Sequence, residues 1–239
     1  MKILISGYGR MGREIETLAI QQGHEIAGIY DKTEDWDENP QPLKTCDVVI
    51  DFSRPVTAPE NIRRCLVAHK PIVVGTTGWH DHLPELTQLC SKMQGAIFYA
   101  PNFSLGINIF LQTAEALAKA LNAFHYEASI REIHHIHKED APSGTAIALA
   151  ARIISQMEQY QSWQLVMGDH ADEGKLPVHA VREGEVTGFH EVTFSSGSDV
   201  IRLSHEALNR SGFALGALAA ARWILNRRGV FTMKDMLSD

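Results

Sequence analysis

The stretch of sequence that decides the fold is residues 2–12, KILISGYGRMG. A short apolar run typical of a buried strand leads into a Gly-x-Gly-x-x-Gly pattern formed by Gly7, Gly9 and Gly12. In this context the first glycine permits a tight turn, the second lets the backbone approach a pyrophosphate, and the third lets the next helix pack on the strand. Because a helix start favours an anion, the stretch predicts a dinucleotide-binding turn. The other residues of the turn that are expected to contact the cofactor are Tyr8, Arg10 and Met11.

An acidic residue stands at the end of the second expected strand. Asp31 follows Gly12 by 19 residues, where a carboxylate can accept hydrogen bonds from the adenosine ribose hydroxyls. This placement favours NADH over NADPH. Lys32 and Arg10 are suited instead to a 2′-phosphate, so both cofactors stay open. The alternative interpretation is a structural turn followed by a solvated strand end.

The rest of the first 102 residues repeats the alternation of short apolar runs with longer amphipathic ones. This alternation predicts an α/β, Rossmann-like, doubly wound parallel sheet covered by helices. Residues 33–45 are acidic, contain prolines and lack apolar periodicity, so a surface loop is expected there in place of a helix. The expected strands are 2–6, 25–30, 47–51, 71–74 and 96–99, and the expected helices are 10–22, 56–69 and 81–93.

Two loops follow the fourth and fifth expected strands. Ligands of open α/β sheets bind outside the carboxyl ends of the strands, so we expect these loops to line the nicotinamide half of the cleft. Taken alone, each loop is equally well explained as an ordinary turn. The residues concerned are Gly75, Thr76, Thr77, Ala100, Pro101, Asn102 and Phe103.

After residue 102 the pattern changes to long helices and β-branched, alternating strands. The change predicts an inserted α+β domain over residues 103–212, between the two parts of a dinucleotide-binding domain over residues 1–102 and 213–239. The active site is expected where these domains meet. The expected helices are 105–121, 144–159 and 213–227, and the expected strands are 126–135, 178–182, 188–196 and 199–205.

Composition narrows the range of partners. The 239 residues carry 22 Lys plus Arg against 29 Asp plus Glu, a net charge of −7, with no basic tract, so nucleic acid is not expected to bind. The apolar runs are too short for a signal peptide or a membrane span, so no membrane partner is expected. The three cysteines are Cys46, Cys65 and Cys90, which lie 19 and 25 residues apart. This spacing fits neither a zinc site nor a disulfide framework, so a reducing cytoplasm is expected.

The densest group of chemically active residues is the segment 132–146, EIHHIHKEDAPSGTA. Three of the 12 histidines and a lysine fall within five positions, directly before a helix start that Ser143 or Thr145 can cap. Gly144 lets an anion approach the unpaired N–H groups of that helix. In a chain of net charge −7, this local cationic patch suits an anionic small molecule.

Three other interpretations of the segment remain open. A zinc site of His134, His135 and His137 is disfavoured, because neighbouring residues of a strand point to opposite faces and no further ligand spacing supports a metal. A purely structural helix cap leaves the histidines and Lys138 unexplained. Cysteine-dependent acyl transfer is disfavoured because the cysteines fall in the cofactor half of the chain. Acid–base chemistry and charge are therefore the expected role, and no metal is expected.

Several motifs together resemble the dihydrodipicolinate reductase (4-hydroxy-tetrahydrodipicolinate reductase) family. They are GRMG at residues 9–12, GTTG at 75–78, PNFS at 101–104, the segment 132–146 and NRSGFALGA at 209–217. The likeness covers essentially the whole chain, and the string HHxxKxDAPSGTA is far more specific than any dinucleotide turn. Two positions depart from the family pattern: the first turn is one residue shorter than usual, and Ile136 stands where many members have arginine.

The resemblance implies a function and a set of residue roles. It implies reduction of 4-hydroxy-tetrahydrodipicolinate to tetrahydrodipicolinate with NADH or NADPH, on the diaminopimelate route to lysine, by a homotetramer built through the sheet of the substrate and oligomerisation domain. His134 is then the proton donor or acceptor and Lys138 the second catalytic group. The resemblance also places the cofactor on the glycine turn, Asp31 and the two later loops. The residues expected to bind the dicarboxylate substrate are His135, Ser143, Gly144 and Thr145.

The expected reaction adds a hydride from the nicotinamide to a cyclic, unsaturated imine dicarboxylate. His134 or Lys138 supplies the proton, directly or through water. Another NAD(P)-dependent reductase of a small keto or imino acid is the first alternative. A non-catalytic dinucleotide-sensing domain is the second, but it needs no acid–base group, and the segment from His134 to Lys138 argues against it.

Overall fold

The computed structural model describes residues 1–168, 171–209 and 211–239. Contacts between residues divide the chain into two compact units, Met1–Leu105 with Ser211–Asp239, and Gly106–Arg210. The sequence placed these boundaries near residues 102 and 213. Arg210, a member of the motif at residues 209–217, lies outside the described residues. Within the described ranges, no helix combines the length and apolar character needed to cross a membrane.

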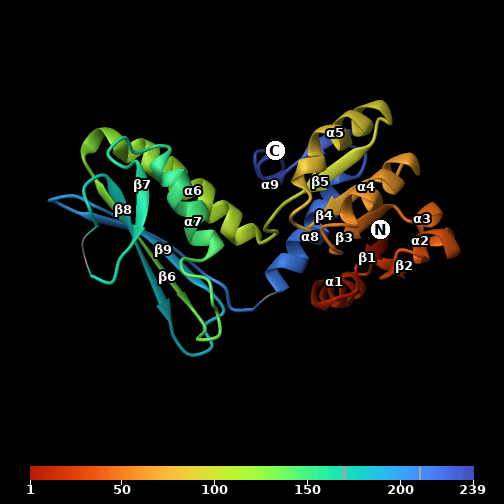
Figure 1. Cartoon of the computed structure of the whole chain (residues 1–239), viewed down its shortest axis with the longest axis horizontal. Coiled ribbons are helices and arrows are strands. Elements are labelled where there is room, and N and C mark those ends of the chain that lie inside the picture. Colours follow the sequence, from red (N-terminus) through yellow and green to blue (C-terminus); the bar gives the residue numbers. More distant parts are fainter. Residues whose placement is uncertain (169–170, 210) are drawn as a thin grey trace. The chain divides into compact units, whose positions relative to one another are not determined.

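The first unit contains a sheet of six parallel strands in the order β11-β5-β4-β3-β1-β2. Figure 1 labels β1 to β5 of this sheet. The order reverses direction at β1, which lies between β2 and β3, as in a doubly wound sheet. The predicted fold class is therefore confirmed. The strands are β1 (Lys2–Ser6), β2 (Glu25–Tyr30), β3 (Val48–Asp51), β4 (Ile72–Val74), β5 (Ala96–Tyr99) and β11 (Gly229–Phe231).

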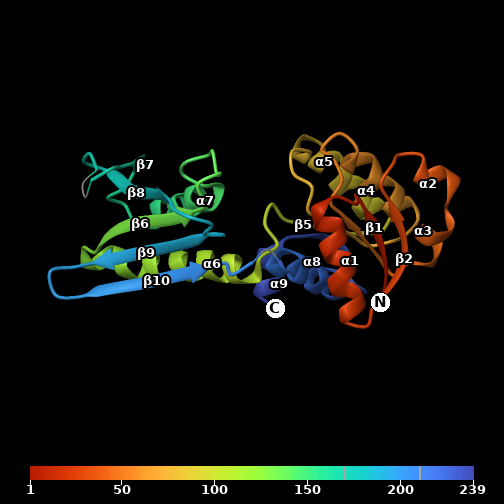
Figure 2. The same ribbon diagram turned by 90° about the horizontal axis from the view of Figure 1, so that it is seen from below.

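Helices cover both faces of this sheet (Figure 2). On one face, α1 (Arg10–Gln21) and the alanine-rich α8 (Ser211–Ile224) bury their apolar sides against the strands. On the other, α4 (Ala58–Val67) and α5 (Leu83–Lys92), which follows the short turn η1 (His80–His82), form a second apolar layer. The two layers bury the strands between them, so the loops at the carboxyl ends of the strands are left to form a ligand site.

Two segments of the first unit differ from expectation. The loop expected over residues 33–45 contains two short helices, α2 (Asp35–Glu38) and α3 (Gln41–Thr45). Only Trp36 is buried in α2 and only Pro42 in α3, so neither helix leaves an apolar period in the sequence. Strand β11 and helix α9 (Met233–Leu237) were not expected either, because each is too short to show a period.

The second unit is an α+β layer, as predicted. Its five-stranded mixed sheet has the order β10-β9-β6-β8-β7, and α6 and α7 pack on one face (Figure 2). Strand β7 was missed, and α7 ends five residues before the expected end because the chain turns after Ile154 and buries Met157. The elements are α6 (Leu105–Leu121), η2 (Asn122–Phe124), β6 (Glu127–His134), α7 (Gly144–Ile154), β7 (Ser162–Leu165), β8 (Lys175–Arg182), β9 (Phe189–Ser195) and β10 (Val200–Glu206).

Candidate functional site

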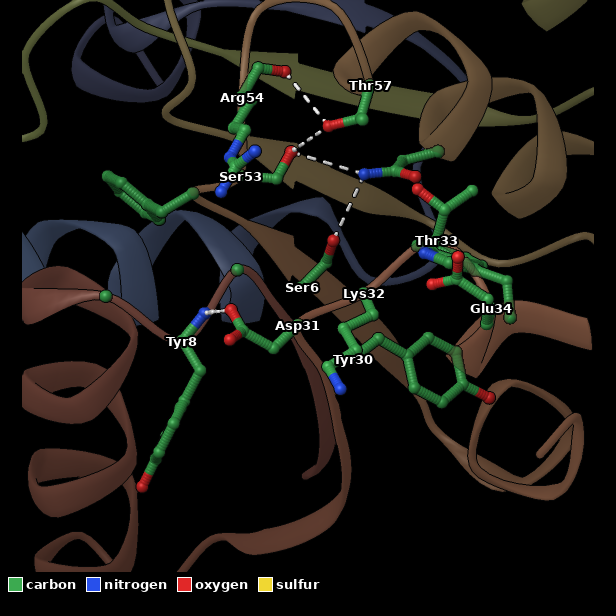
Figure 3. Close-up of a pocket in the computed structure, with 15 residues that line it drawn as sticks. Ser6, Tyr8, Tyr30, Asp31, Lys32, Thr33, Glu34, Ser53, Arg54 and Thr57 are labelled. Atoms are coloured by element: carbon green, nitrogen blue, oxygen red, sulfur yellow. Dashed lines mark hydrogen bonds between the residues drawn. The ribbon is translucent and has the colours of Figure 1, made fainter. Parts of the chain in front are cut away.

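A cavity of about 540 Å³ opens at the carboxyl ends of β1, β2 and β3 (Figure 3). This is the point at which the strand order reverses, where ligands of doubly wound sheets bind. Its volume lies within the range usual for sites of small molecules and cofactors. The wall is formed by residues 6–9 of the glycine turn, residues 30–34 after β2, and residues 52–54 after β3, together with Trp36, Thr57 and Asn61.

The glycine turn has the geometry that an anion requires. Gly7 has φ +85°, and a Cβ there would meet the carbonyl oxygen of Phe52 at 2.4 Å. A Cβ at Gly12 would meet the carbonyl oxygen of Gly7 at 2.3 Å, so this glycine lets the turn close on the helix. Gly9 faces open space and begins α1 without a side-chain cap. The open backbone at the start of α1 fits a dinucleotide pyrophosphate.

Asp31 closes the turn from the side of β2. Its Oδ1 accepts a hydrogen bond of 2.7 Å from the backbone N–H of Tyr8 (Figure 3). Asp35 fixes the backbone that follows β2, because its Oδ2 accepts hydrogen bonds from the backbone N–H groups of Asp31 and Lys32, both at 2.8 Å. Asp31 and Lys32 both line the cavity. The carboxylate suited to the ribose hydroxyls of NADH and the ammonium group suited to the 2′-phosphate of NADPH are therefore neighbours.

A buried carboxylate at the end of β3 ties the cavity loops together. Asp51 is fully buried and accepts hydrogen bonds from Ser6, Ser53, Asn61 and Thr76, at 2.7 to 2.9 Å for the shortest contact of each. These donors come from β1, the β3 loop, α4 and the Gly-Thr-Thr-Gly loop. Asp51 was not among the predicted site residues, although its place at the carboxyl end of a buried strand was a usable signal.

The loops that follow β4 and β5 contact the cavity wall through the side chain of Phe52. The ring of this cavity residue lies 5.8 Å from that of Phe103 and fills the space that a side chain at Gly75 would need. Thr76 joins the group through its hydrogen bond to Asp51. The remaining predicted cofactor residues do not line this cavity: Arg10, Met11, Gly12, Thr77, Ala100, Pro101 and Asn102.

The second unit gathers polar side chains at the end of β6. Glu132 and His134 occupy positions on the face of the sheet that packs against α6 and α7 and are buried. Strand pairing places His190 opposite Glu132 and Arg182 opposite His134. Nδ1 of His134 contacts Oε2 of Glu132, and the rings of His134 and His190 meet edge to face at 5.1 Å.

The segment after β6 presents the other predicted residues. Nζ of Lys138 lies 2.6 and 2.8 Å from the two carboxylate oxygens of Asp140. Ser143 is the N-cap of α7 and accepts the N–H of Ala146 at 3.2 Å. Gly144 faces open space, so an anion can approach the start of the helix. The site residues His135 and Thr145 are partly buried in the same stretch, and Ile136 is largely exposed.

Charges in this cluster are settled by burial and pairing. Burial tends to raise the pKa of Glu132, but the contacts with His134 and Arg182 outweigh it and leave this pKa below its usual value. Burial lowers the pKa of His190 to about 4, so this ring is neutral near pH 7. Lys138 lowers the pKa of Asp140 through their hydrogen bond. The cluster thus contains an ionised Glu132 next to a neutral His190.

Three of these side chains also form a candidate metal group. Glu132, His134 and His190 each place one ligand atom within 4.8 Å of the others. This group differs from the one weighed in the sequence, because it contains neither His135 nor His137, and β6 and β9 bring Glu132 and His190 to His134 across the sheet. Arg182 donates to Glu132 at 3.0 Å and opposes a second cation there.

The cysteines are unsuited to nucleophilic chemistry. Cys46, Cys65 and Cys90 are free and buried. Burial raises the pKa of each thiol, to about 11 for Cys46. A thiolate, the reactive form, is therefore scarce near neutral pH.

Comparison with known proteins places the chain in a family. Two family models match it: "Dihydrodipicolinate reductase, N-terminus" over residues 1–103 and "Dihydrodipicolinate reductase, C-terminus" over residues 106–237. The chain belongs to the dihydrodipicolinate reductase family. A 4-hydroxy-tetrahydrodipicolinate reductase from Christiangramia forsetii is 44% identical over 100% of this chain and 98% of its own length. Another from Archaeoglobus fulgidus is 33% identical, with 99% and 100% covered.

Solved structures share the fold of this dihydrodipicolinate reductase family member. A dipicolinate-bound dihydrodipicolinate reductase from a Paenisporosarcina species matches with a TM-score of 0.81 at 21% identity, over 97% of each chain. A scyllo-inositol dehydrogenase from Lactobacillus casei matches with a TM-score of 0.58 at 13% identity, over 99% of this chain and 92% of its own. The predicted family is confirmed. As a member of the dihydrodipicolinate reductase family, the chain is an oxidoreductase that uses a nicotinamide dinucleotide.

Proposed function

We propose that the chain reduces 4-hydroxy-tetrahydrodipicolinate to tetrahydrodipicolinate with NADH or NADPH, on the diaminopimelate route to lysine. The observation that carries the proposal is the family match along nearly the whole chain, with relatives named for this reaction. Turnover of freshly generated hydroxytetrahydrodipicolinate with each cofactor, followed at the NADH absorbance band, tests it. Turnover of small keto or imino acids alone, or of nothing, would favour the other reductase or the dinucleotide sensor.

In this proposal the first unit binds the dinucleotide. The open backbone at Gly9 receives the pyrophosphate, and Asp31 accepts from the ribose hydroxyls. The bound nicotinamide supplies the hydride. The proposed cofactor residues are Gly7, Tyr8, Gly9, Arg10, Met11, Gly12, Asp31, Gly75, Thr76, Thr77, Ala100, Pro101, Asn102 and Phe103.

The second unit binds and protonates the substrate in this proposal. The start of α7 at Ser143, Gly144 and Thr145 takes a substrate carboxylate, and His135 lies close along the chain. Lys138 adds a positive charge that makes the dicarboxylate a better hydride acceptor. His134 supplies the proton, with Lys138 as the second catalytic group.

The proposal includes a homotetramer in the cytoplasm. On the face of the second sheet away from α6 and α7, Ile133 pairs across the strands with Val181 and Phe189, and all three are partly exposed. This apolar patch suits contact between copies of the sheet, and light scattering after gel filtration measures the state. Free buried thiols suit a reducing compartment.

Replacing Asp31 by alanine is expected to shift the cofactor preference toward NADPH. The unaltered protein should use NADH at least as well as NADPH, because a carboxylate accepts from ribose hydroxyls and repels a 2′-phosphate. Loss of a hydrogen bond to a charged group predicts a fall of about tenfold or more in kcat/KM for NADH. Asp37→Asn, on exposed α2, is the matched control and should leave the ratio unchanged. A clear preference of the unaltered protein for NADPH contradicts the prediction and favours Lys32 and Arg10.

Exhaustive chelation is expected to leave activity intact. Although Glu132, His134 and His190 come within 4.8 Å, Arg182 already neutralises the carboxylate, and the proposed reaction needs His134 as an acid rather than a ligand. Metal analysis of the purified protein should show no stoichiometric zinc. One tightly held zinc per chain, lost together with activity, would make these histidines ligands.

A further inference from the structure

The catalytic proposal leaves a buried ion pair beside His134 without a role. Glu132 is fully buried, and its Oε1 accepts from Nη2 of Arg182 at 3.0 Å and from the N–H of Ser143 at 3.2 Å. Its Oε2 contacts Nδ1 of His134. Buried ion pairs are weak sources of stability, because desolvation offsets most of their attraction. This pair therefore calls for a reason other than stability.

We propose that Glu132 is the positioning residue of His134, and that Arg182 joins this pair to the segment that carries Lys138; the inference rests on the proposed function. Oε2 of Glu132 and Nδ1 of His134 are buried, contact each other and have no hydrogen bond to any further described residue. An ionised carboxylate can only accept a hydrogen bond, so the pairing of these two atoms requires the ring proton on Nδ1. In the neutral ring the other nitrogen, Nε2, is then the basic one. Glu132 thus selects which nitrogen handles the substrate proton.

The surroundings of Nε2 agree with this assignment. A Cβ at Gly188 would lie 3.2 Å from Nε2, so the absence of a side chain there leaves the nitrogen uncovered. His190 packs against the ring from the side and is neutral, because burial lowers its pKa to about 4. Its Nε2 lies 3.1 Å from Oγ of Ser143, which fixes His190 to the start of α7.

Arg182 extends the same contact to the second proposed catalytic group. Its Nε donates to the carbonyl oxygen of Lys138 at 3.2 Å, and its Nη2 donates to that of Asp140 at 2.5 Å. The guanidinium therefore holds the backbone at the lysine and two residues beyond it while it pairs with Glu132. One ion pair fixes the ring of His134 and the segment of Lys138 relative to each other.

A double-mutant cycle tests the inference. Glu132→Gln is expected to lower kcat at least about tenfold, with KM within about threefold, because the ring loses the charge that orients it. If Glu132 acts through His134, the double variant Glu132→Gln/His134→Gln should be no slower than His134→Gln alone. Losses that multiply in the double variant, or an unchanged kcat in Glu132→Gln, would overturn the inference. A near-normal kcat in His134→Gln would instead contradict the proposed function.

The chain offers a matched control for the loss of charge. Glu115 on α6 pairs with Arg152 on α7 at 2.7 Å, in the same unit but with both side chains about one-third exposed. Glu115→Gln removes the same charge from a Glu–Arg pair and should leave kcat unchanged. An equal loss in Glu115→Gln would show that disturbance of the unit, rather than positioning, lowers kcat.

Nitrogen NMR of the His134 ring provides a readout that does not depend on activity. In the unaltered protein we expect the neutral ring to carry its proton on Nδ1, and a proton on Nε2 instead overturns the inference. If Glu132→Gln fails to fold, Glu132→Leu/Arg182→Met removes both charges together, a replacement that buried pairs often tolerate. In that variant the neutral ring should no longer carry its proton on Nδ1, and kcat should fall below that of the unaltered protein. A variant that keeps both the Nδ1 proton and the unaltered kcat would also overturn the inference.

Discussion

Replacing His134 by glutamine is expected to lower kcat by about 10²–10⁴-fold, the usual loss when acid–base help is removed, while KM stays within a few-fold. Glutamine keeps the size and polarity of the side chain but cannot deliver a proton. The structure strengthens the expectation, because His134 is buried beside an ionised Glu132 that suits it to proton transfer. Steady-state kinetics with freshly generated substrate measures the effect.

His137 provides the control for this variant. It lies three residues further along, is exposed and contacts Glu185 at 3.3 Å. His137→Gln should therefore leave kcat unchanged. NADH binding without substrate, measured by fluorescence, should be normal in both variants, because the glycine turn belongs to the other unit. Near-normal kcat in His134→Gln, or lost NADH binding, would show that the active site is misplaced.

Replacing Lys138 by alanine is expected to raise KM for the substrate as well as to lower kcat. A charge-assisted contact with a substrate carboxylate in a partly desolvated site contributes about 2–5 kcal/mol. The side chain is 22% exposed, which places the effect in the lower part of that range, or about 30- to 100-fold in kcat/KM. Asp140 holds the ammonium ion at 2.6 Å, so the substrate must share or replace this partner.

Lys175→Ala is the matched control for Lys138→Ala. Lys175 also pairs with an aspartate of its own segment, Asp172, at 2.8 Å, but lies at the start of β8, at the opposite end from Arg182. Removal of the Lys175 side chain should leave both KM and kcat unchanged. A fall in kcat at constant KM in Lys138→Ala would mean that the lysine acts in chemistry alone, without binding the carboxylate.

Much of the fold could be predicted because its signals are local. Buried parallel strands are almost continuously apolar, so β1 to β5 stand out from the amphipathic helices between them. The glycine turn and Asp31 have a fixed spacing along the chain. Strand β11 was missed because three residues show no period, and α2 and α3 because each buries only one side chain.

The candidate site was predictable only where it is continuous in the sequence. The segment from His134 to Thr145 was found, but Arg182 and His190 join it through strand pairing across about 50 residues. That register cannot be read from one sequence. A usable signal was nevertheless present, because Glu132 and His134 continue the alternate positions that Ala128 and Ile130 fill with apolar side chains. A charged residue in an apolar series indicates a buried partner.

The return of the chain to its first unit has a consequence for biosynthesis. Strand β11 completes the parallel sheet beside β5, and α8 fills one face of it with Ala214, Ala217 and Ala221. The ribosome makes these elements after all of the inserted unit, so the first 105 residues emerge without one of the two helices that cover this face of their sheet. Such exposed apolar surface is prone to aggregation. The inserted unit is therefore expected to fold first, and the nascent first unit to need protection until α8 arrives.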